Sequence, residues 1–169
     1  MSLVGQLETV VEVKTSAAQL HEVFSCMPYI VTITSPERVQ SCELIQGEWG
    51  KEGSVICWRL TRALFCCRTV LLSDGSDPQI SKEIMEVIDN ENSITIYKLI
   101  EGRMLETYKN FFSIAKISPK DDDEGSLVYW TYKYEKHNED APDLDDKLIH
   151  MATNVIKNID AYLVAQLQA

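Results

Sequence analysis

The stretch that decides the fold is GSLVYWTYKYE, residues 125–135, in which a large side chain occupies every second position. Successive side chains of a β-strand point to opposite faces, so this spacing predicts a half-buried strand with one bulky face. That face carries Val128, Trp130, Tyr132 and Tyr134. Residues 143–167 have a helical pattern and are long enough to cover the aromatic rings. The two segments together predict a curved antiparallel sheet that wraps around one long helix, with space for a ligand between them.

The rest of the chain predicts an α+β protein, because two short helices follow the first strand and a run of strands follows them. The predicted helices are 17–24 and 28–34, and the predicted strands are 3–13, 39–46, 56–60, 80–88, 93–100, 105–118 and 125–135. The final helix is predicted to begin near Asp140, with Pro142 in its first turn. Its apolar stripe consists of Leu144, Leu148, Met151, Ala152, Val155, Ile159 and Leu163. No repeat or linker divides residues 1–169, so the sequence predicts a single domain.

Charge and composition argue against several classes of partner. The chain has 169 residues and a net charge of −10, which disfavours binding to nucleic acid and to an anionic membrane surface. No stretch approaches the roughly 20 apolar residues of a membrane-spanning helix. The start of the chain lacks the pattern of a signal peptide, so we expect a cytoplasmic protein whose five cysteines stay reduced. The three histidines lack metal-ligand spacing, and the sequence predicts neither a metal site nor a cofactor.

The inward faces of the predicted strands allow two interpretations. Their apolar and aromatic residues could surround a cavity for a flat apolar ligand, with tyrosine hydroxyls orienting it, or they could pack into a solid core. Strand 105–118 also leaves its register open, because two sets of alternate residues compete for the inward face. The sets are Tyr108, Asn110 and Phe112 on one side and Phe111, Ser113 and Ala115 on the other.

Glu83 is a weak candidate for a catalytic residue. Counting back from the turn at residues 100–102 places it on the inward face of strand 80–88. A carboxyl in a dry cavity would have a raised pKa and could act as an acid or a base, whereas a carboxyl at the rim would simply reach water. The loop 47–53 lacks the spacing of a phosphate-binding loop. It predicts a tight turn in which Gly47, Gly50 and Gly53 supply unusual backbone angles.

Four stretches resemble the plant major latex protein-like proteins of the Bet v I, or pathogenesis-related class-10, superfamily. They are MSLVGQLETVVEVKTSA (1–17), CELIQGEWGKEGSV (42–55), YKLIEGRMLETYKNF (97–111) and GSLVYWTYKYEK (125–136), the last followed by the terminal helix. The resemblance implies a helix-grip (Bet v I/START-like) fold, in which a seven-stranded antiparallel sheet and two short helices surround a long C-terminal helix and a hydrophobic cavity. About ten residues between Leu60 and Pro78 look inserted. Their apolar part, 63–72, could lengthen a hairpin, cap the cavity, form an interface or represent retained non-coding sequence.

The resemblance implies an intracellular carrier for small hydrophobic plant metabolites or hormones, with a role in defence or stress responses. The implied ligands are steroids, flavonoids, cytokinins or alkaloid-like compounds, and we expect a monomer or a weak dimer. The alternative is a metal-free acid–base isomerase, lyase or cyclase of specialised metabolism. One strand position that carries a cavity lysine in condensing enzymes of the superfamily is matched here by Tyr129, which weakens that particular chemistry. The predicted ligand-binding residues are Ile56, Trp58, Leu60, Glu83, Met85, Tyr97, Leu99, Tyr108, Val128, Trp130, Tyr132, Tyr134, Leu148, Met151, Ala152 and Val155.

Overall fold

A computed structural model describes residues 3–61, 79–121 and 124–168 of the chain. In chain order the elements are β1 (Val4–Val13), α1 (Ala17–Cys26), η1 (Pro28–Ile30), α2 (Val31–Thr34), β2 (Val39–Gln46), β3 (Val55–Leu60), β4 (Gln79–Asp89), β5 (Ile94–Glu101), α3 (Met104–Thr107), β6 (Tyr108–Pro119), β7 (Ser126–Lys136) and α4 (Asp146–Leu167). This is the α+β order predicted from the sequence. The apolar segment 63–72, for which the sequence left several roles open, lies outside the described residues.

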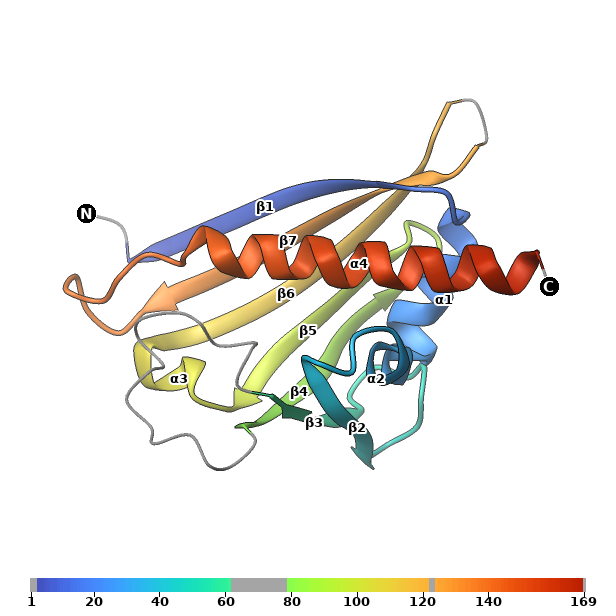
Figure 1. Ribbon diagram of the computed structural model, residues 1–169. Coiled ribbons are helices and arrows are strands. Elements are labelled where there is room, and N and C mark those ends of the chain that lie inside the picture. Colours follow the sequence, from blue (N-terminus) through green and yellow to red (C-terminus); the bar gives the residue numbers. More distant parts are fainter. Residues whose placement is uncertain (1–2, 62–78, 122–123, 169) are drawn as a thin grey trace.

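The seven strands form one antiparallel sheet with the order β1-β7-β6-β5-β4-β3-β2. Strands β2 to β7 each pair with their neighbours in the chain, whereas β1 pairs with β7, the last strand. α4 lies across one face of this sheet (Figure 1). α1 and α2 lie near the C-terminal end of α4. The predicted arrangement of a sheet around one long helix is therefore confirmed. A ligand-binding site in this fold would lie between the helix and the sheet.

β7 buries the face that the alternation of residues 125–135 predicts. Val128 and Tyr134 are almost fully buried, and Tyr132 is 9% exposed. Trp130 is half-buried and packs against each of the three apolar clusters in the described interior. It therefore lies where the apolar surfaces of α1, of α4 and of strands β3 to β5 meet, which makes it the central side chain of the fold.

The register of β6 combines the two predicted alternatives, because a β-bulge separates its parts. Tyr108 is buried at the start of the strand, and the pairing with β7 shifts between Tyr108 and Asn110. Beyond the shift the buried residues are Phe111, Ser113, Ala115 and Ile117. A bulge moves every later side chain to the opposite face, and a period of two cannot reveal where it occurs. The predicted start of this strand at residue 105 is wrong, because Met104–Thr107 form the one-turn helix α3.

The predicted start of the last helix near Asp140 is also wrong. α4 begins at Asp146, and Asp145 caps it by accepting a hydrogen bond of 2.9 Å from Lys147 N. Pro142 thus precedes the helix and is not in its first turn. The side-chain cap satisfies a backbone N–H that the helix itself leaves without a partner, which favours a start at this point.

Tertiary hydrogen bonds hold the segment before α4 in a non-helical path. The carbonyl oxygen of Pro142 accepts a bond of 3.0 Å from the Tyr108 hydroxyl, and Leu144 N donates one of 3.3 Å to the Tyr134 hydroxyl. Leu144 is buried although it lies outside the helix. Within the helix, Ile156 is 1% exposed and belongs to the apolar face, a position that the predicted stripe omitted.

The glycine-rich loop between β2 and β3 is a tight turn, as predicted. Gly47, Gly50 and Gly53 have φ angles of 86°, 81° and 85°, in the region that glycine adopts at least cost. The loop packs against β4, since Gly53 N donates a hydrogen bond of 2.8 Å to the Met85 carbonyl oxygen. It therefore fixes the start of β3, the strand that carries Trp58.

Candidate ligand-binding site

A cavity of about 200 Å³ lies between α4 and the sheet. A water molecule takes up roughly 30 Å³ of the liquid, so the interior holds far more than a packing defect. The volume is below the roughly 300–1,000 Å³ of sites that enclose drug-sized ligands, which favours a compact guest. The sequence left open a cavity or a solid core, and the structure has a cavity with almost entirely apolar walls.

Most of the predicted ligand-binding residues line this cavity. They are Trp58, Leu60, Glu83, Tyr97, Leu99, Trp130, Tyr132, Leu148, Met151, Ala152 and Val155. The others do not line it and are buried in the packed interior; they are Ile56, Met85, Tyr108, Val128 and Tyr134. Strand alternation identifies the inward face, but it does not say which inward positions lie opposite the gap between sheet and helix.

Several lining residues were not predicted. They are Val23, Phe24, Pro28, Val31, Val39, Ser81, Met104, Phe111, Ser113, Ile156 and Ile159. Ile159 belonged to the predicted helical stripe, and Val23 and Phe24 lie on α1, whose apolar face the sequence displays. The closing of the cavity by α1 and α2 depends on how those helices fold back onto the sheet, which no local pattern shows.

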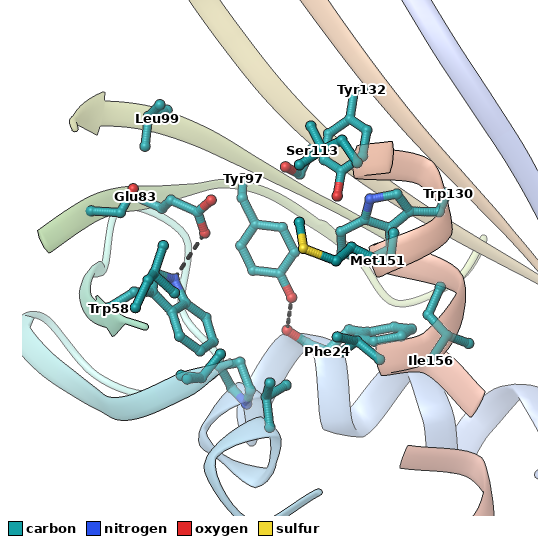
Figure 2. A pocket seen from close by; sticks show the side chains of 18 of the residues that line it. Phe24, Trp58, Glu83, Tyr97, Leu99, Ser113, Trp130, Tyr132, Met151 and Ile156 are labelled. Atoms are coloured by element: carbon teal, nitrogen blue, oxygen red, sulfur yellow. Dashed lines mark hydrogen bonds between the residues drawn. The ribbon is translucent and has the colours of Figure 1, made fainter. Parts of the chain in front are cut away.

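Glu83 is the titratable carboxyl of the cavity wall. Its Oε2 accepts a hydrogen bond of 3.0 Å from the Trp58 indole Nε1, and the two side chains lie on the same wall (Figure 2). Burial raises the pKa of Glu83 from 4.5 to about 7, and the bond from Trp58 opposes that rise without cancelling it. The side chain keeps partial exposure, which we attribute to the cavity, because Glu83 is among the lining residues. This placement supports the buried alternative over a carboxyl at the rim.

The tyrosine hydroxyls mostly serve the fold. The Tyr97 hydroxyl donates to the carbonyl oxygen of Phe24 and so ties β5 to α1 (Figure 2). The hydroxyls of Tyr108 and Tyr134 bond to the segment before α4, as described above. Of the predicted tyrosines, only Tyr132 therefore has a hydroxyl that could orient a ligand. Its ring lines the cavity beside Trp130.

Other candidate residues contribute no chemistry to the cavity. Tyr129 pairs with Val10 of β1, lies on the opposite face of β7 from Trp130 and is not a lining residue, so its identity says nothing about chemistry inside. His21 is buried on α1, and its Nε2 lies 3.0 Å from Asn90 Oδ1. Among the described residues no cluster of His, Cys, Asp and Glu could hold a metal ion. The described part of the chain also contains no helix that is long and apolar enough to cross a membrane.

Comparison with known proteins agrees with this architecture. The model of the pathogenesis-related protein Bet v 1 family matches residues 2–166. The MLP-like protein 43 of Arabidopsis thaliana is 33% identical over 165 residues, which cover 98% of this chain and 96% of that protein. The crystal structure of major latex-like protein 151 from Panax ginseng superposes with a TM-score of 0.80 at 29% identity, covering 95% of this chain and 98% of that one.

An enzyme shares the fold at a greater distance. Norcoclaurine synthase from Thalictrum flavum, solved with dopamine and hydroxybenzaldehyde, has a TM-score of 0.67 at 19% identity and covers 92% of this chain and 86% of its own. At that identity the likeness concerns the fold alone. The family match and the Arabidopsis relative, each spanning nearly the whole chain, identify this protein as a member of the Bet v 1 family, in which it is similar to the major latex protein-like proteins.

Proposed function

We propose that this protein binds and carries a compact, largely apolar small molecule in the cavity between α4 and the sheet. The cavity itself is the observation that supports the proposal, because the side chains leave about 200 Å³ unfilled although cores normally pack closely. Burial of apolar surface would supply most of the affinity. Among the ligand classes that the family resemblance implies, the volume favours small ring compounds such as cytokinins over steroids. A role in plant defence or stress responses follows from the resemblance alone.

Binding of a small apolar fluorescent dye of the naphthol class tests this proposal. Ala152→Phe places a large ring in the cavity and should abolish dye binding while the protein remains folded by circular dichroism. Ala161→Phe, at an exposed position on the same helix, is the matched control and should bind as wild type does. Equal dye affinity in both variants would overturn the cavity as the binding site. If the two variants differ as expected, mass spectrometry of small molecules that co-purify with the native protein would identify the ligand.

A second candidate function is acid–base isomerisation, which the position of Glu83 favours. A carboxyl with a pKa of about 7 can both accept and donate a proton near neutral pH. Its carboxylate could remove a proton from the carbon between the carbonyl and the double bond of a β,γ-unsaturated ketone, then return one to the γ-carbon. Isomerisation of the β,γ-unsaturated ketone cyclohex-3-enone tests this second function. The absorbance of the conjugated product measures the rate. Glu83→Gln should abolish turnover but retain ligand if the protein is an isomerase, whereas no turnover in wild type would leave only binding.

We propose further that residues 1–169 form a single domain that works in the cytoplasm. The single sheet takes strands from both the first and the last parts of the chain, and the family model spans residues 2–166. Cys26, Cys42 and Cys57 are free thiols, which suits a reducing compartment. Limited proteolysis that yields one resistant core, and imaging of a fluorescent fusion in plant cells, would test the two statements.

A further inference from the structure

The cavity contains a carboxyl group without a cationic partner. Oε2 of Glu83 accepts the bond from Trp58, and Oε1 has no hydrogen-bond partner among the described residues. None of the described lining residues is Lys, Arg or His. Buried carboxylates are ordinarily paired with a charge, because an isolated ionised group in an apolar setting is costly. The missing partner at Oε1 is therefore a position that a ligand can fill.

A second unsatisfied group lies on the opposite side of Tyr97. Trp130 Nε1 is buried without a hydrogen-bond partner in the described structure. Burial raises the pKa of the neighbouring Tyr132 phenol, and the nearby Trp130 N–H lowers it by less. The Trp130 N–H and the Tyr132 oxygen nevertheless do not meet hydrogen-bond geometry. Figure 2 shows Trp130, Tyr132 and Ser113 together on this side, with Glu83 and Trp58 on the other. A buried N–H without an acceptor costs free energy, and a ligand oxygen would remove that cost.

The two polar positions lie on opposite sides of a mostly apolar space, whose lining also includes Ser81 and Ser113. Glu83 is on β4 and Trp130 is on β7, three strands apart in the sheet. Three strand spacings correspond to about 14 Å between backbones, and side chains that reach inward from both strands leave a gap that a two-ring compound spans. Tyr97, which lies between them, has its hydroxyl engaged with Phe24 and presents its ring.

We propose that the cavity selects a compact two-ring compound with a protonated amine at the end that meets Glu83 and a hydrogen-bond acceptor at the end that meets Trp130. The proposal rests on the binding function above and specifies its ligand. An ammonium group would give Glu83 the charge partner that the described walls lack. An ether or carbonyl oxygen would accept the Trp130 N–H, and the rings would fill the apolar space.

Three naphthalenes of equal size test the two ends separately by calorimetry. The first carries aminomethyl and methoxy groups at opposite ends of the rings. The second replaces the amine by a methyl group, and the third replaces the ether oxygen by a methylene group. At pH 8 the first should bind roughly tenfold or more tightly than the second, and severalfold more tightly than the third. Glu83→Gln should remove the first difference, and Trp130→Phe the second.

Matched variants control for unrelated effects. Glu86→Gln removes an exposed carboxyl from the same strand, and Trp49→Phe changes a tryptophan that does not line the cavity. Both should keep the full order of affinities. Retention of the amine preference in Glu83→Gln, or of the ether preference in Trp130→Phe, would overturn the assignment of that end.

The pH dependence of wild type provides a test that needs no variant. Cys42 on β2, Tyr97 on β5 and Tyr132 on β7 interact with Glu83, and the pKa of each is raised, so they stay neutral below pH 9. As Glu83 becomes protonated below pH 7, the preference for the amine over the methyl analogue should fall, by up to about tenfold for each pH unit, until the preference is lost. Three equal affinities at every pH would overturn this inference and leave the binding function intact. Failure of all three compounds and of the dye would overturn both.

Discussion

Trp58 Nε1 donates a hydrogen bond of 3.0 Å to Glu83 Oε2 and so joins β3 to β4 within the cavity wall. The bond stabilises the ionised carboxylate, whereas burial destabilises it by more, and the balance sets the pKa of Glu83 at about 7. The charge inside the cavity therefore changes near physiological pH. Both the stability of the protein and its choice of ligand should respond to that change.

Glu83→Gln should alter the pH dependence of stability. The pKa of Glu83 is 4.5 in the unfolded chain and about 7 in the folded protein, so the folded state binds more protons between these values. The free energy of unfolding therefore falls as pH rises from 4.5 to 7, by up to about 3 kcal/mol. The variant should be more stable than wild type at pH 8 and equal to it at pH 4, as measured by urea denaturation. Parallel stability curves would contradict the burial of this carboxyl.

Trp58→Phe should raise the pKa of Glu83 further. The phenyl ring keeps much of the apolar contact but cannot donate the hydrogen bond that favours the ionised form. Titration of the Glu83 side-chain carboxyl carbon by NMR measures the shift. Trp49→Phe is the control, because Trp49 packs against Tyr29 and does not line the cavity. An unchanged pKa in Trp58→Phe would mean that the indole contributes nothing to the charge state.

Tyr134→Phe should lower stability by about 1 kcal/mol without changing ligand affinity. Its hydroxyl accepts a bond of 3.3 Å from Leu144 N and lies 3.3 Å from Asp143 Oδ1, which fastens the segment before α4 to β7. The residue was predicted to bind ligand, yet it does not line the cavity. Urea denaturation together with dye titration separates the two roles. A loss of dye affinity at unchanged stability would restore it to the binding site.

Gly125→Ala and Gly53→Ala should differ in cost although both glycines have positive φ, of 92° and 85°. A Cβ at Gly125 would collide with the backbone of Val13, whereas a Cβ at Gly53 meets nothing within 4 Å. Gly53→Ala should cost roughly 1–2 kcal/mol from backbone strain alone. Gly125→Ala should cost clearly more, since β1 and the turn into β7 must separate. Equal shifts in the thermal midpoint would show that the turn moves freely.

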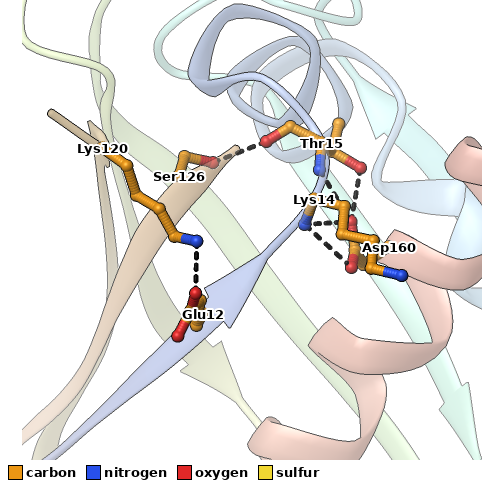
Figure 3. A network of polar contacts seen from close by, with 6 residues as sticks. All are labelled: Glu12, Lys14, Thr15, Lys120, Ser126 and Asp160. Carbon is orange, nitrogen blue, oxygen red and sulfur yellow. Dashed lines mark hydrogen bonds and ion pairs between the residues drawn. The ribbon is translucent and has the colours of Figure 1, made fainter. Parts of the chain in front are cut away.

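Asp160→Ala should weaken the attachment of α4 to the start of α1. The carboxylate accepts bonds of 3.1 Å from Lys14 N, 2.9 Å from Thr15 N and 2.6 Å from Thr15 Oγ1 (Figure 3). Its loss leaves these donors without their acceptor and should cost about 2 kcal/mol of unfolding free energy. Asp146→Ala, an exposed carboxyl in the first turn of α4, should cost much less. Equal losses in urea denaturation would contradict an anchoring role.

Local pattern in the sequence determined the strands, the short helices and the inward face of β7. Side chains at Val128, Trp130, Tyr132 and Tyr134 alternate over a full strand, and this spacing has one physical meaning wherever the strand packs. The sequence also predicts the glycine turn at 47–53, because its positive φ angles occur at Gly47, Gly50 and Gly53, which adopt them at least cost. The resemblance to major latex protein-like chains then implied a seven-stranded antiparallel sheet around the terminal helix, which the structure confirms.

Only the tertiary structure decided where the chain departs from regular patterns and which inward residues meet empty space. The bulge after Tyr108 and the late start of α4 depend on partners distant in sequence, since Tyr108 and Tyr134 bond to the segment before the helix. Whether Glu83 lies in the wall or at the rim depends on how closely α4 approaches the sheet. The alternation of side chains predicts which side of a strand is buried. The size of a cavity depends on the distance between the helix and the sheet, and neither segment alone determines that distance.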